Sequence, residues 1–143
     1  KKIIDSNYTG IVSLCNLVAS DFESRKEGFV IGISSVAGDR GRKSNYLYGS
    51  AKAAVSTYLS GLRGRLSRVN VPVMTVKPGF VNTRMTKDLD LPQKLVGEPD
   101  QVANDIYKAW KKGKHEVYTR WFWKYIMLII KYIPEFIFKK MDI

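Results

Sequence analysis

Apolar positions along this chain fall into two patterns, short continuous runs and longer stretches with helical spacing. The runs at residues 29–34 and 71–76 have the length and composition of strands that are buried on both faces. Around them, apolar residues recur every three or four positions, which indicates helices. The pattern therefore predicts helices and strands in alternation: helix 3–27, strand 29–34, helix 47–69, strand 71–76, helix 99–112 and strand 116–118.

This alternation predicts an α/β fold. Strands that are apolar throughout and separated by helices form parallel sheets with right-handed crossovers. Gly28 and Gly113 stand where the first and third helices should end, and Pro99 suits the first turn of the third helix. The segment 78–98 is long for a connection inside a compact domain, and such segments usually carry function or move.

The helix predicted over residues 47–69 presents two different stripes. One follows a four-three spacing and should face the core; its members are Tyr48, Lys52, Val55, Leu59, Leu62 and Leu66. The other is small throughout and consists of Ser50, Ala53, Thr57, Gly61 and Gly64. Small residues allow a second helix to approach closely. This second stripe is either part of a subunit interface or a lightly packed surface.

Two polar residues head the core-facing stripe. Tyr48 and Lys52 are four residues apart, so a helix places their side chains on one face. A free tyrosine is a poor acid at neutral pH, because a phenol ionises only at about pH 10. An ammonium group beside a phenol favours the phenolate and makes the phenol a better proton donor. Ser35, at the end of the preceding strand run, can hold a carbonyl oxygen beside this pair.

The composition narrows the classes of function. With 143 residues and 45% hydrophobic content, the chain suits one globular domain. Its single cysteine, Cys15, excludes an internal disulfide, fits a reducing cytoplasmic compartment and falls in the apolar register of the first helix. The only histidine, His115, has no cysteine or acidic cluster around it, so we expect no metal site.

The net charge of +11 is unevenly distributed, with nine basic and three acidic side chains among residues 106–143. A basic segment suggests an anionic partner, either nucleic acid or membrane phosphate. Within the tail at residues 120–143, the charged residues Arg120, Lys124, Lys131 and Glu135 would share one narrow arc of a helix. The rest of the first three turns is aromatic or aliphatic, which disfavours nucleic acid because its binding needs basic residues among exposed polar positions.

Aromatic residues flanked by lysines are typical of a segment that lies in the headgroup region of a membrane. The longest uncharged run, residues 125–130, is far too short to span a bilayer, and Pro134 should break the helix. We therefore expect peripheral attachment to an anionic membrane surface, with packing of the tail on the body or on a second subunit as the alternative. The expected membrane contacts are Trp121, Trp123, Lys124, Ile126, Ile130 and Lys131.

Four motifs in a fixed order connect these features to a known family. They are Asn7 in Ser-Asn-Tyr-Thr-Gly, Ser35 after the first strand run, Tyr48-Gly-Ser-Ala-Lys52, and the Pro-Gly-Phe-Val-Asn-Thr loop at 78–83. In this order they resemble the short-chain dehydrogenase/reductase family, and the resemblance covers nearly the whole chain. It implies a Rossmann-like sheet and the reduction of a ketone with NAD(H) or NADP(H).

The resemblance also implies a role for each motif residue. Tyr48 would donate the proton to the carbonyl oxygen, and Lys52 would support Tyr48 and bind the nicotinamide ribose. Ser35 would hold the substrate oxygen, and Asn7 would position a water that returns the proton through Lys52. The residues implied at the cofactor are Tyr48, Lys52, Pro78, Gly79, Val81 and Thr83.

One element of that family is not found. The cofactor diphosphate binds at a glycine-rich turn, and no Gly-x-x-x-Gly-x-Gly occurs in this sequence. We therefore interpret residues 1–119 as the C-terminal, catalytic part of a doubly wound parallel sheet, followed by an amphipathic tail at 120–143. This chain alone is expected to be inactive, and NADH and NADPH are not distinguished. The family also implies a homodimer or tetramer through helices 3–27 and 47–69.

A narrower resemblance extends into the tail. Several segments are similar to reductases that act on decaprenylphosphoryl 2-keto-pentoses, namely 7–9, 38–43, 77–79 with 83–85, 112–114 and 125–140. This similarity implies a keto-sugar on a polyprenyl phosphate, a precursor of cell-envelope glycans. The basic loop residues Arg40, Arg42 and Lys43 are then candidates for binding a substrate phosphate, or they form a solvated loop. Two further alternatives remain open, another lipophilic ketone as substrate and a non-catalytic fragment that attaches to membranes or oligomerises.

Overall fold

An open parallel sheet forms the centre of the protein, which a computed structural model describes for residues 1–141. Its strands β1 (Val30–Ile33), β2 (Val73–Pro78) and β5 (Glu116–Thr119) lie in the order β1-β2-β5, and both pairings are parallel. Strands β3 (Phe80–Val81) and β4 (Val96–Gly97) form a small second parallel pair. The predicted α/β fold is confirmed, with the second predicted strand displaced by two residues.

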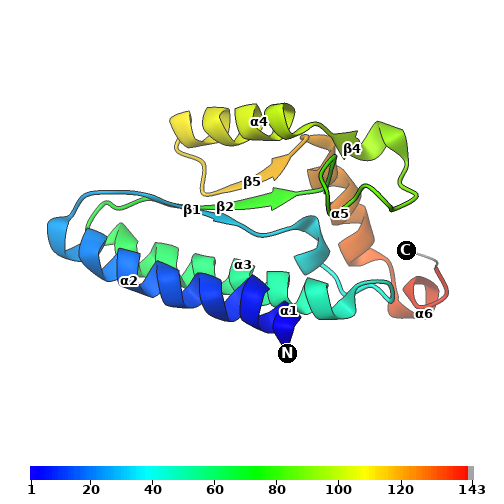
Figure 1. The fold of residues 1–143 in the computed structure, drawn as a ribbon, viewed down its shortest axis with the longest axis horizontal. Helices are drawn as coiled ribbons and strands as arrows, with labels where there is room; N and C mark the ends of the chain where they lie inside the picture. Colours follow the sequence, from blue (N-terminus) through cyan, green and yellow to red (C-terminus); the bar gives the residue numbers. More distant parts are fainter. Residues whose placement is uncertain (142–143) are drawn as a thin grey trace.

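Helices cover both faces of this sheet (Figure 1). The N-terminal helix consists of α1 (Lys2–Ile4), a π-helical segment (Asp5–Thr9) and α2 (Gly10–Arg25). It lies beside α3 (Tyr46–Ser67) on one face of the sheet, and α4 (Pro99–Lys111) covers the other face. Two short 3₁₀ turns complete the body, η2 (Val36–Gly38) and η3 (Gln93–Leu95).

The first helix does not end as the sequence predicted. The left-handed residue at its end is Lys26, with φ of 56°, and its N–H bonds to the carbonyl of Phe22. Gly28 is therefore not the cap. It adopts φ of 123° in the turn toward β1, where a Cβ would lie 2.7 Å from the Phe22 ring. Glycine is needed there for both the backbone conformation and the space.

The predicted core-facing stripe of α3 is confirmed. Its residues Val55, Leu59 and Leu66 are fully buried beneath the sheet, and Cys15 of α2 packs against the same cluster. Gly32 in β1 leaves room for this packing, because a Cβ there would overlap the Leu59 side chain. The stripe of small residues, in contrast, faces outward.

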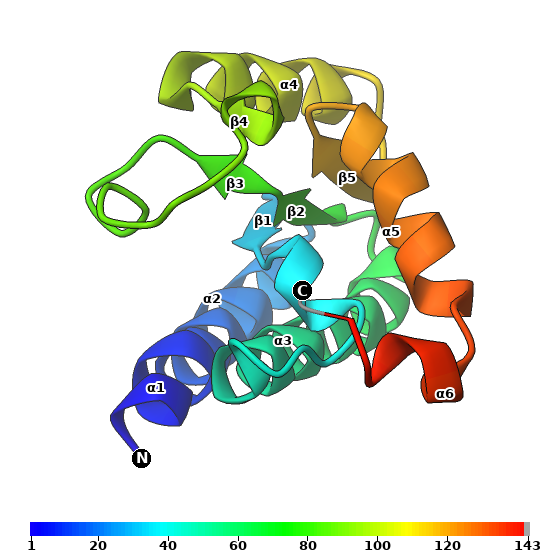
Figure 2. The same cartoon turned by 90° about the vertical axis from the view of Figure 1, so that its right-hand side faces the viewer.

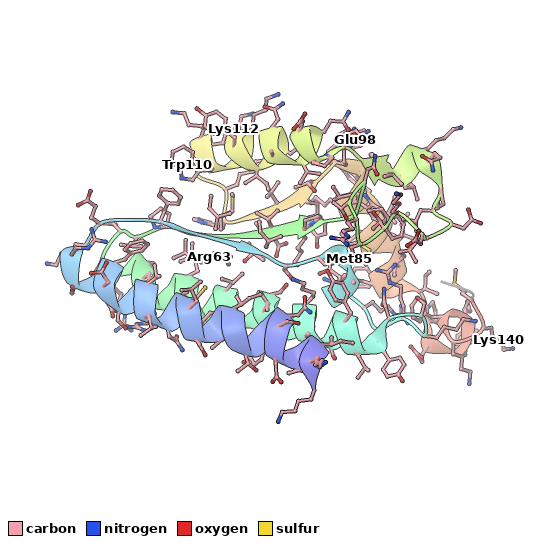
Figure 3. The ribbon with its side chains drawn as sticks, in the orientation of Figure 1. Arg63, Met85, Glu98, Trp110, Lys112 and Lys140 are labelled. Carbon is pink, nitrogen blue, oxygen red and sulfur yellow. The ribbon has the colours of Figure 1, made fainter. Side chains whose placement is uncertain are left out.

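A single arginine connects α3 to the amino ends of β2 and β5. Arg63, labelled in Figure 3, donates hydrogen bonds to the carbonyl of Val73 at 2.9 Å, the hydroxyl of Thr75 at 2.8 Å and the carbonyl of His115 at 2.8 Å. These acceptors belong to β2 and to the residue before β5. The opposite end of the sheet, where the strands have their carboxyl ends, holds the loops and the tail (Figure 2).

The tail forms two helices, α5 (Phe122–Tyr132) and α6 (Glu135–Phe138), with the break expected at Pro134. Asp142 and Ile143 of the predicted tail lie outside the described residues. The predicted charged arc is wrong, because α5 is shorter than expected. Arg120 precedes it in a left-handed conformation, and Glu135 lies in the next helix. No helix among residues 1–141 is both long and apolar enough to cross a bilayer.

The orientation of α5 corrects the predicted membrane contacts. Trp123 is only 2% exposed and Met127 is fully buried, and both pack with Val36 of the 3₁₀ turn. Ile126 and Ile130 are half-buried against the same cluster, so these two residues and Trp123 face the protein. The remaining three predicted contacts, Trp121, Lys124 and Lys131, are exposed. The alternative that the tail packs on the body is therefore correct for its inner face.

Candidate active site

The predicted site residues come together at the carboxyl ends of β1 and β2, around a cavity of about 440 Å³. Four separate segments contribute to it: the π-helical turn, the loop after β1, the first turns of α3 and the segment after β2. The cavity is lined by Asn7, Ser35, Tyr48, Lys52, Pro78, Gly79, Val81 and Thr83, together with Arg42, Asn45 and several apolar residues. A larger, separate groove of about 570 Å³ lies between α2 and α3 and contains none of these residues.

The two serines after β1 have different tasks. Ser35 has an extended backbone and caps the 3₁₀ turn, accepting a hydrogen bond from the N–H of Ala37 at 3.1 Å. Ser34 also lines the cavity, but its hydroxyl is bonded to α3. It donates to the Lys52 carbonyl at 2.9 Å and shares a hydrogen bond with the Ser56 hydroxyl at 2.7 Å. Ser34 thus fastens α3 to the strand, and the Ser35 hydroxyl is the one with a donor available to a ligand.

Two glycines bring the 3₁₀ turn directly onto α3. A Cβ at Gly38 would lie 2.7 Å from the backbone nitrogen of Ala53, and a Cβ at Gly49 would lie 2.8 Å from the carbonyl oxygen of Ala37. Neither glycine can be replaced without moving backbone. This close contact fixes the position of Ser35 relative to Tyr48.

Lys52 is a buried cation that lines the cavity, at 8% exposure. Its ammonium nitrogen lies 5.7 Å from the centroid of the Tyr48 ring and donates to the carbonyl of Ile33 at 3.3 Å. Burial lowers the pKa of Lys52. A lysine has three N–H donors, and within the described residues this one uses a single acceptor. Lys52 can therefore support Tyr48 and still bind hydroxyl groups of a ligand.

Asn7 reaches the cavity from an irregular turn of the first helix. The π-helical segment Asp5–Thr9 widens the helix there, and such segments occur frequently at functional sites. The side-chain amide of Asn7 donates to the carbonyl of Ile3 at 3.1 Å and to the Ser6 hydroxyl at 3.2 Å. The sequence predicted Asn7 but not the π-helical turn, which has no signature in residue spacing.

A buried polar cluster connects the loop after β1 to the end of β2. The ammonium of Lys77 lies 2.9 Å from a carboxylate oxygen of Asp39 and 2.9 Å from one of Glu116, and the Tyr118 hydroxyl donates to Asp39 at 2.6 Å. Burial acts to lower the pKa of Lys77, but the two carboxylates outweigh it and raise that pKa. Burial and Asp39 both raise the pKa of Tyr118. Asp39 belongs to the loop after β1, and Lys77 immediately precedes Pro78. The cluster therefore joins two of the segments that line the cavity.

The tail also contributes to the site. A Cβ at Gly79 would overlap the indole of Trp123, so Gly79 is needed here for space. The neighbouring Phe80 contacts the same indole edge to face, with ring centroids 5.2 Å apart. Trp123, which the sequence analysis assigned to the membrane, therefore packs against Gly79 and Phe80 and supports this part of the cavity wall. No sequence pattern indicates this contact, because nearly every face of α5 is aromatic or aliphatic.

The three basic residues of the loop point to different places. Arg40 binds the tail, donating to the carbonyls of Ile130 and Ile133 at 2.6 Å each. Lys43 lies in a separate surface cleft with Glu135 and other tail residues. Only Arg42 lines the cavity. The prediction that all three meet a substrate phosphate is therefore wrong for Arg40, whose guanidinium is used by the tail.

Part of the cavity wall was not predicted at all. Phe80, Met85 and Leu89 give it an apolar side, and Met85 is exposed on the long loop (Figure 3). The amide of Asn45 also lines the cavity, and its side-chain oxygen is buried without a hydrogen bond. The sequence indicated only that the long segment 78–98, to which all three apolar residues belong, has a function.

Comparisons with known proteins show the family to which the chain belongs. Residues 1–94 match the family described as short chain dehydrogenase, and the chain belongs to this family. An uncharacterized oxidoreductase of Mycobacterium tuberculosis is 34% identical over 139 residues, which cover 97% of this chain and 55% of the relative. An uncharacterized oxidoreductase of Myxococcus xanthus is 33% identical over 119 residues, covering 83% and 47%. The chain thus spans about half the length of the curated relatives it matches.

Solved structures share the fold at lower identity. A short chain dehydrogenase of Burkholderia cenocepacia, determined in complex with NADP, superposes with a TM-score of 0.83 at 20% identity over 98% of this chain and 57% of that one. The bulky-bulky ketone specific alcohol dehydrogenase of Comamonas testosteroni gives a TM-score of 0.70 at 20% identity, over 90% and 52%. These similarities confirm the predicted fold class, which is part of a Rossmann-like sheet.

Proposed function

We propose that this chain carries the catalytic part of an NAD(P)H-dependent reductase that converts a ketone to an alcohol. The observation that carries the proposal is the meeting of Ser35, Tyr48 and Lys52 in one cavity, in a chain of the short chain dehydrogenase family. Ser35 comes from the loop after β1, and Tyr48 and Lys52 come from α3. The two glycine contacts between the 3₁₀ turn and α3 hold the arrangement rigid. Rigid placement is what general acid catalysis requires.

The chemistry follows from the residues. A bound reduced nicotinamide supplies the hydride. Ser35 holds the carbonyl oxygen of the substrate, and Tyr48 donates its phenolic proton to that oxygen as it becomes an alcohol. The Lys52 ammonium stabilises the phenolate that remains. Asn7, across the cavity, positions the water through which the proton is replaced.

The residues present fit the nicotinamide end of the cofactor. Pro78, Gly79, Val81 and Thr83 form one side of the cavity, and Lys52 has donors available for the ribose hydroxyls. The diphosphate end has no glycine-rich turn in this sequence. Strand β1 lies at the edge of the three-stranded sheet, and Phe29 beside it is exposed. This open edge supports a sheet that continues past β1 in the whole protein, with the diphosphate site on that other part.

For the substrate, we propose a keto-sugar on a polyprenyl phosphate, with another lipophilic ketone as the alternative. The apolar wall of Phe80, Met85 and Leu89 suits a ligand with a hydrophobic part. The outer face of the tail supports peripheral attachment to an anionic membrane, because it combines exposed aromatic and aliphatic side chains with nearby lysines. The exposed members are Trp121, Tyr125, Leu128, Ile129, Tyr132, Phe136 and Ile137.

The outer faces of α2 and α3 are the surface through which we propose that the protein forms an oligomer. The groove between them is lined by small residues and by Tyr8, Tyr58 and Arg65. A Cβ at Gly61 or Gly64 would meet nothing within 4 Å, so these glycines face open space that a second helix pair can occupy. We propose that a homodimer or tetramer forms there.

Substitution of Tyr48 in the complete reductase tests the proposed chemistry. Tyr48→Phe keeps the ring and removes the acid, so turnover should fall about 100- to 10,000-fold while cofactor affinity changes little. Tyr46→Phe is the matched control, because Tyr46 is an exposed tyrosine two residues earlier on the same helix. Near-normal turnover of Tyr48→Phe would contradict the mechanism. A complete protein that binds neither NADH nor NADPH would favour the non-catalytic alternative.

A further inference from the structure

Arg42 is a buried cation of the cavity that has neither a counter-charge nor a side-chain hydrogen bond among the described residues. Arg42 is only 7% exposed and lines the cavity with Tyr48 and Asn45. Within residues 1–141 its guanidinium has no ion pair, and its Nε is buried without a hydrogen bond. Burial lowers the pKa of Arg42, yet a guanidinium stays protonated at neutral pH. The protein thus holds a full positive charge at the cavity wall.

The other buried or half-buried cations near the cavity have acceptors within the described residues, and Lys52 donates to the carbonyl of Ile33. Lys77 lies between the carboxylates of Asp39 and Glu116. Arg40 has two backbone carbonyls and the Glu135 carboxylate. A buried charge without a partner is strongly unfavourable, and proteins normally pair it. At Arg42 the direction from which a partner can come is the cavity.

We infer that Arg42 binds an oxyanion carried by the ketone substrate, such as a phosphate or carboxylate group, and so determines specificity for anionic ketones. This inference rests on the proposed ketone reduction at Tyr48. The planar guanidinium of Arg42 matches the spacing of two oxygens in a phosphate or carboxylate and can donate two parallel hydrogen bonds to them. The nearby buried oxygen of Asn45 needs a donor, and a hydroxyl on the same substrate supplies one. A hydroxylated ketone bearing an oxyanion satisfies both groups at once.

The direct test is binding of a matched pair of probes to the full 143-residue chain. Dihydroxyacetone phosphate and dihydroxyacetone share the ketone and differ in the phosphate, and isothermal titration at fixed ionic strength measures both. Wild type should bind the phosphorylated probe about 10- to 150-fold more tightly, as expected for a hydrogen bond to a charged group of about 1.5–3 kcal/mol. Arg42→Leu should lose this preference, and Arg42→Lys should retain part of it because the charge remains without the fork.

Three controls make the outcome decisive. Arg68→Leu removes the same charge from an exposed arginine that does not line the cavity and should leave the preference unchanged. Tyr48→Phe should also leave it unchanged, so that failure of the proposed catalysis and failure of anion binding are separate results. Levulinate against 2-pentanone repeats the comparison with a carboxylate and tells which oxyanion is preferred. Equal binding of charged and neutral probes, or an unchanged preference in Arg42→Leu, overturns the inference. A loss in Arg68→Leu as large as that in Arg42→Leu shows only a general charge effect and overturns it as well.

Discussion

Arg40 joins the tail to the loop that carries the site, and replacing it should release the tail. Its guanidinium donates to the carbonyls of Ile130 and Ile133 at 2.6 Å each, pairs with Glu135 at 2.9 Å and lies 3.7 Å from the centroid of the Phe138 ring. The two carbonyls stand at the end of α5, where backbone acceptors have no partner within the helix. Arg40→Met keeps much of the hydrophobic side-chain stem and removes all of these interactions, together with a longer hydrogen bond of 3.3 Å to the carbonyl of Lys131.

The size of the effect can be worked out from these contacts. Hydrogen bonds from a charged donor are worth about 1.5–3 kcal/mol each, and a stacked cation about 1–2 kcal/mol when partly desolvated. The pair with Glu135 adds at most about 1 kcal/mol, because that carboxylate is largely exposed. One side chain makes all of these contacts, so they do not add, and we expect a loss of about 3–4 kcal/mol. Trp123 and Met127 still hold α5, so the loss should appear as opening of the tail before the whole domain unfolds.

Hydrogen exchange followed by mass spectrometry measures this opening directly. In Arg40→Met, amides of residues 122–138 should exchange at least about 100-fold faster, the factor that corresponds to about 3 kcal/mol, while amides of α3 change little. Lys124→Met, which removes an exposed cation from α5, should leave the pattern unchanged. Arg40→Lys should recover only part of the protection, because an ammonium cannot reproduce the planar fork. Equal exchange in Arg40→Met and wild type would show that apolar packing alone holds the tail.

Two further predictions concern the site lysine and the membrane. Because burial lowers the pKa of Lys52, its charged form destabilises the folded state, so Lys52→Met should be more stable than wild type at neutral pH and inactive in the complete reductase. This gain should shrink as pH rises toward 10.5, where lysine in the unfolded chain also loses its proton; urea unfolding at several pH values checks the sign. For the membrane, replacing Trp121, Ile129 and Tyr132 together by serine should reduce co-sedimentation with anionic liposomes at low salt without lowering the melting temperature, since all three are exposed. An unchanged bound fraction, or no binding by the wild-type chain, would remove the support for a membrane role.

Much of the fold could be predicted because it depends on short-range periodicity. The buried stripe of α3 followed from four-three spacing, and the continuous apolar runs identified β1 and β2. The triad could be proposed from Tyr48 and Lys52 because a helix fixes their relation, and from Ser35 because strand ends meet at one edge of a sheet. In each case, neighbours in sequence decide where a side chain points.

The loop and the tail could not be predicted in the same way. Arg40, Arg42 and Lys43 are alike in sequence, and no period tells which one turns toward the cavity. Their directions are set by partners far along the chain, such as Glu135 for Arg40. In α5 nearly every face is aromatic or aliphatic, so hydrophobicity alone does not identify the inner side. The inner side is determined by Gly79, because the missing side chain leaves space for the indole of Trp123.

These long-range contacts have a consequence for how the site is held. The loop after β1 is fixed at three independent places: Gly38 contacts the backbone of α3, Asp39 binds Lys77, and Arg40 binds the end of α5. Arg42 follows directly after these anchors, so its backbone is held in place before any ligand arrives, and little backbone entropy is lost on binding. The tail therefore acts on the cavity through Arg40 and Trp123 whether or not its outer face contacts a membrane. A ligand or surface that moves α5 should change the affinity of the cavity for anions, and one that leaves α5 in place should not.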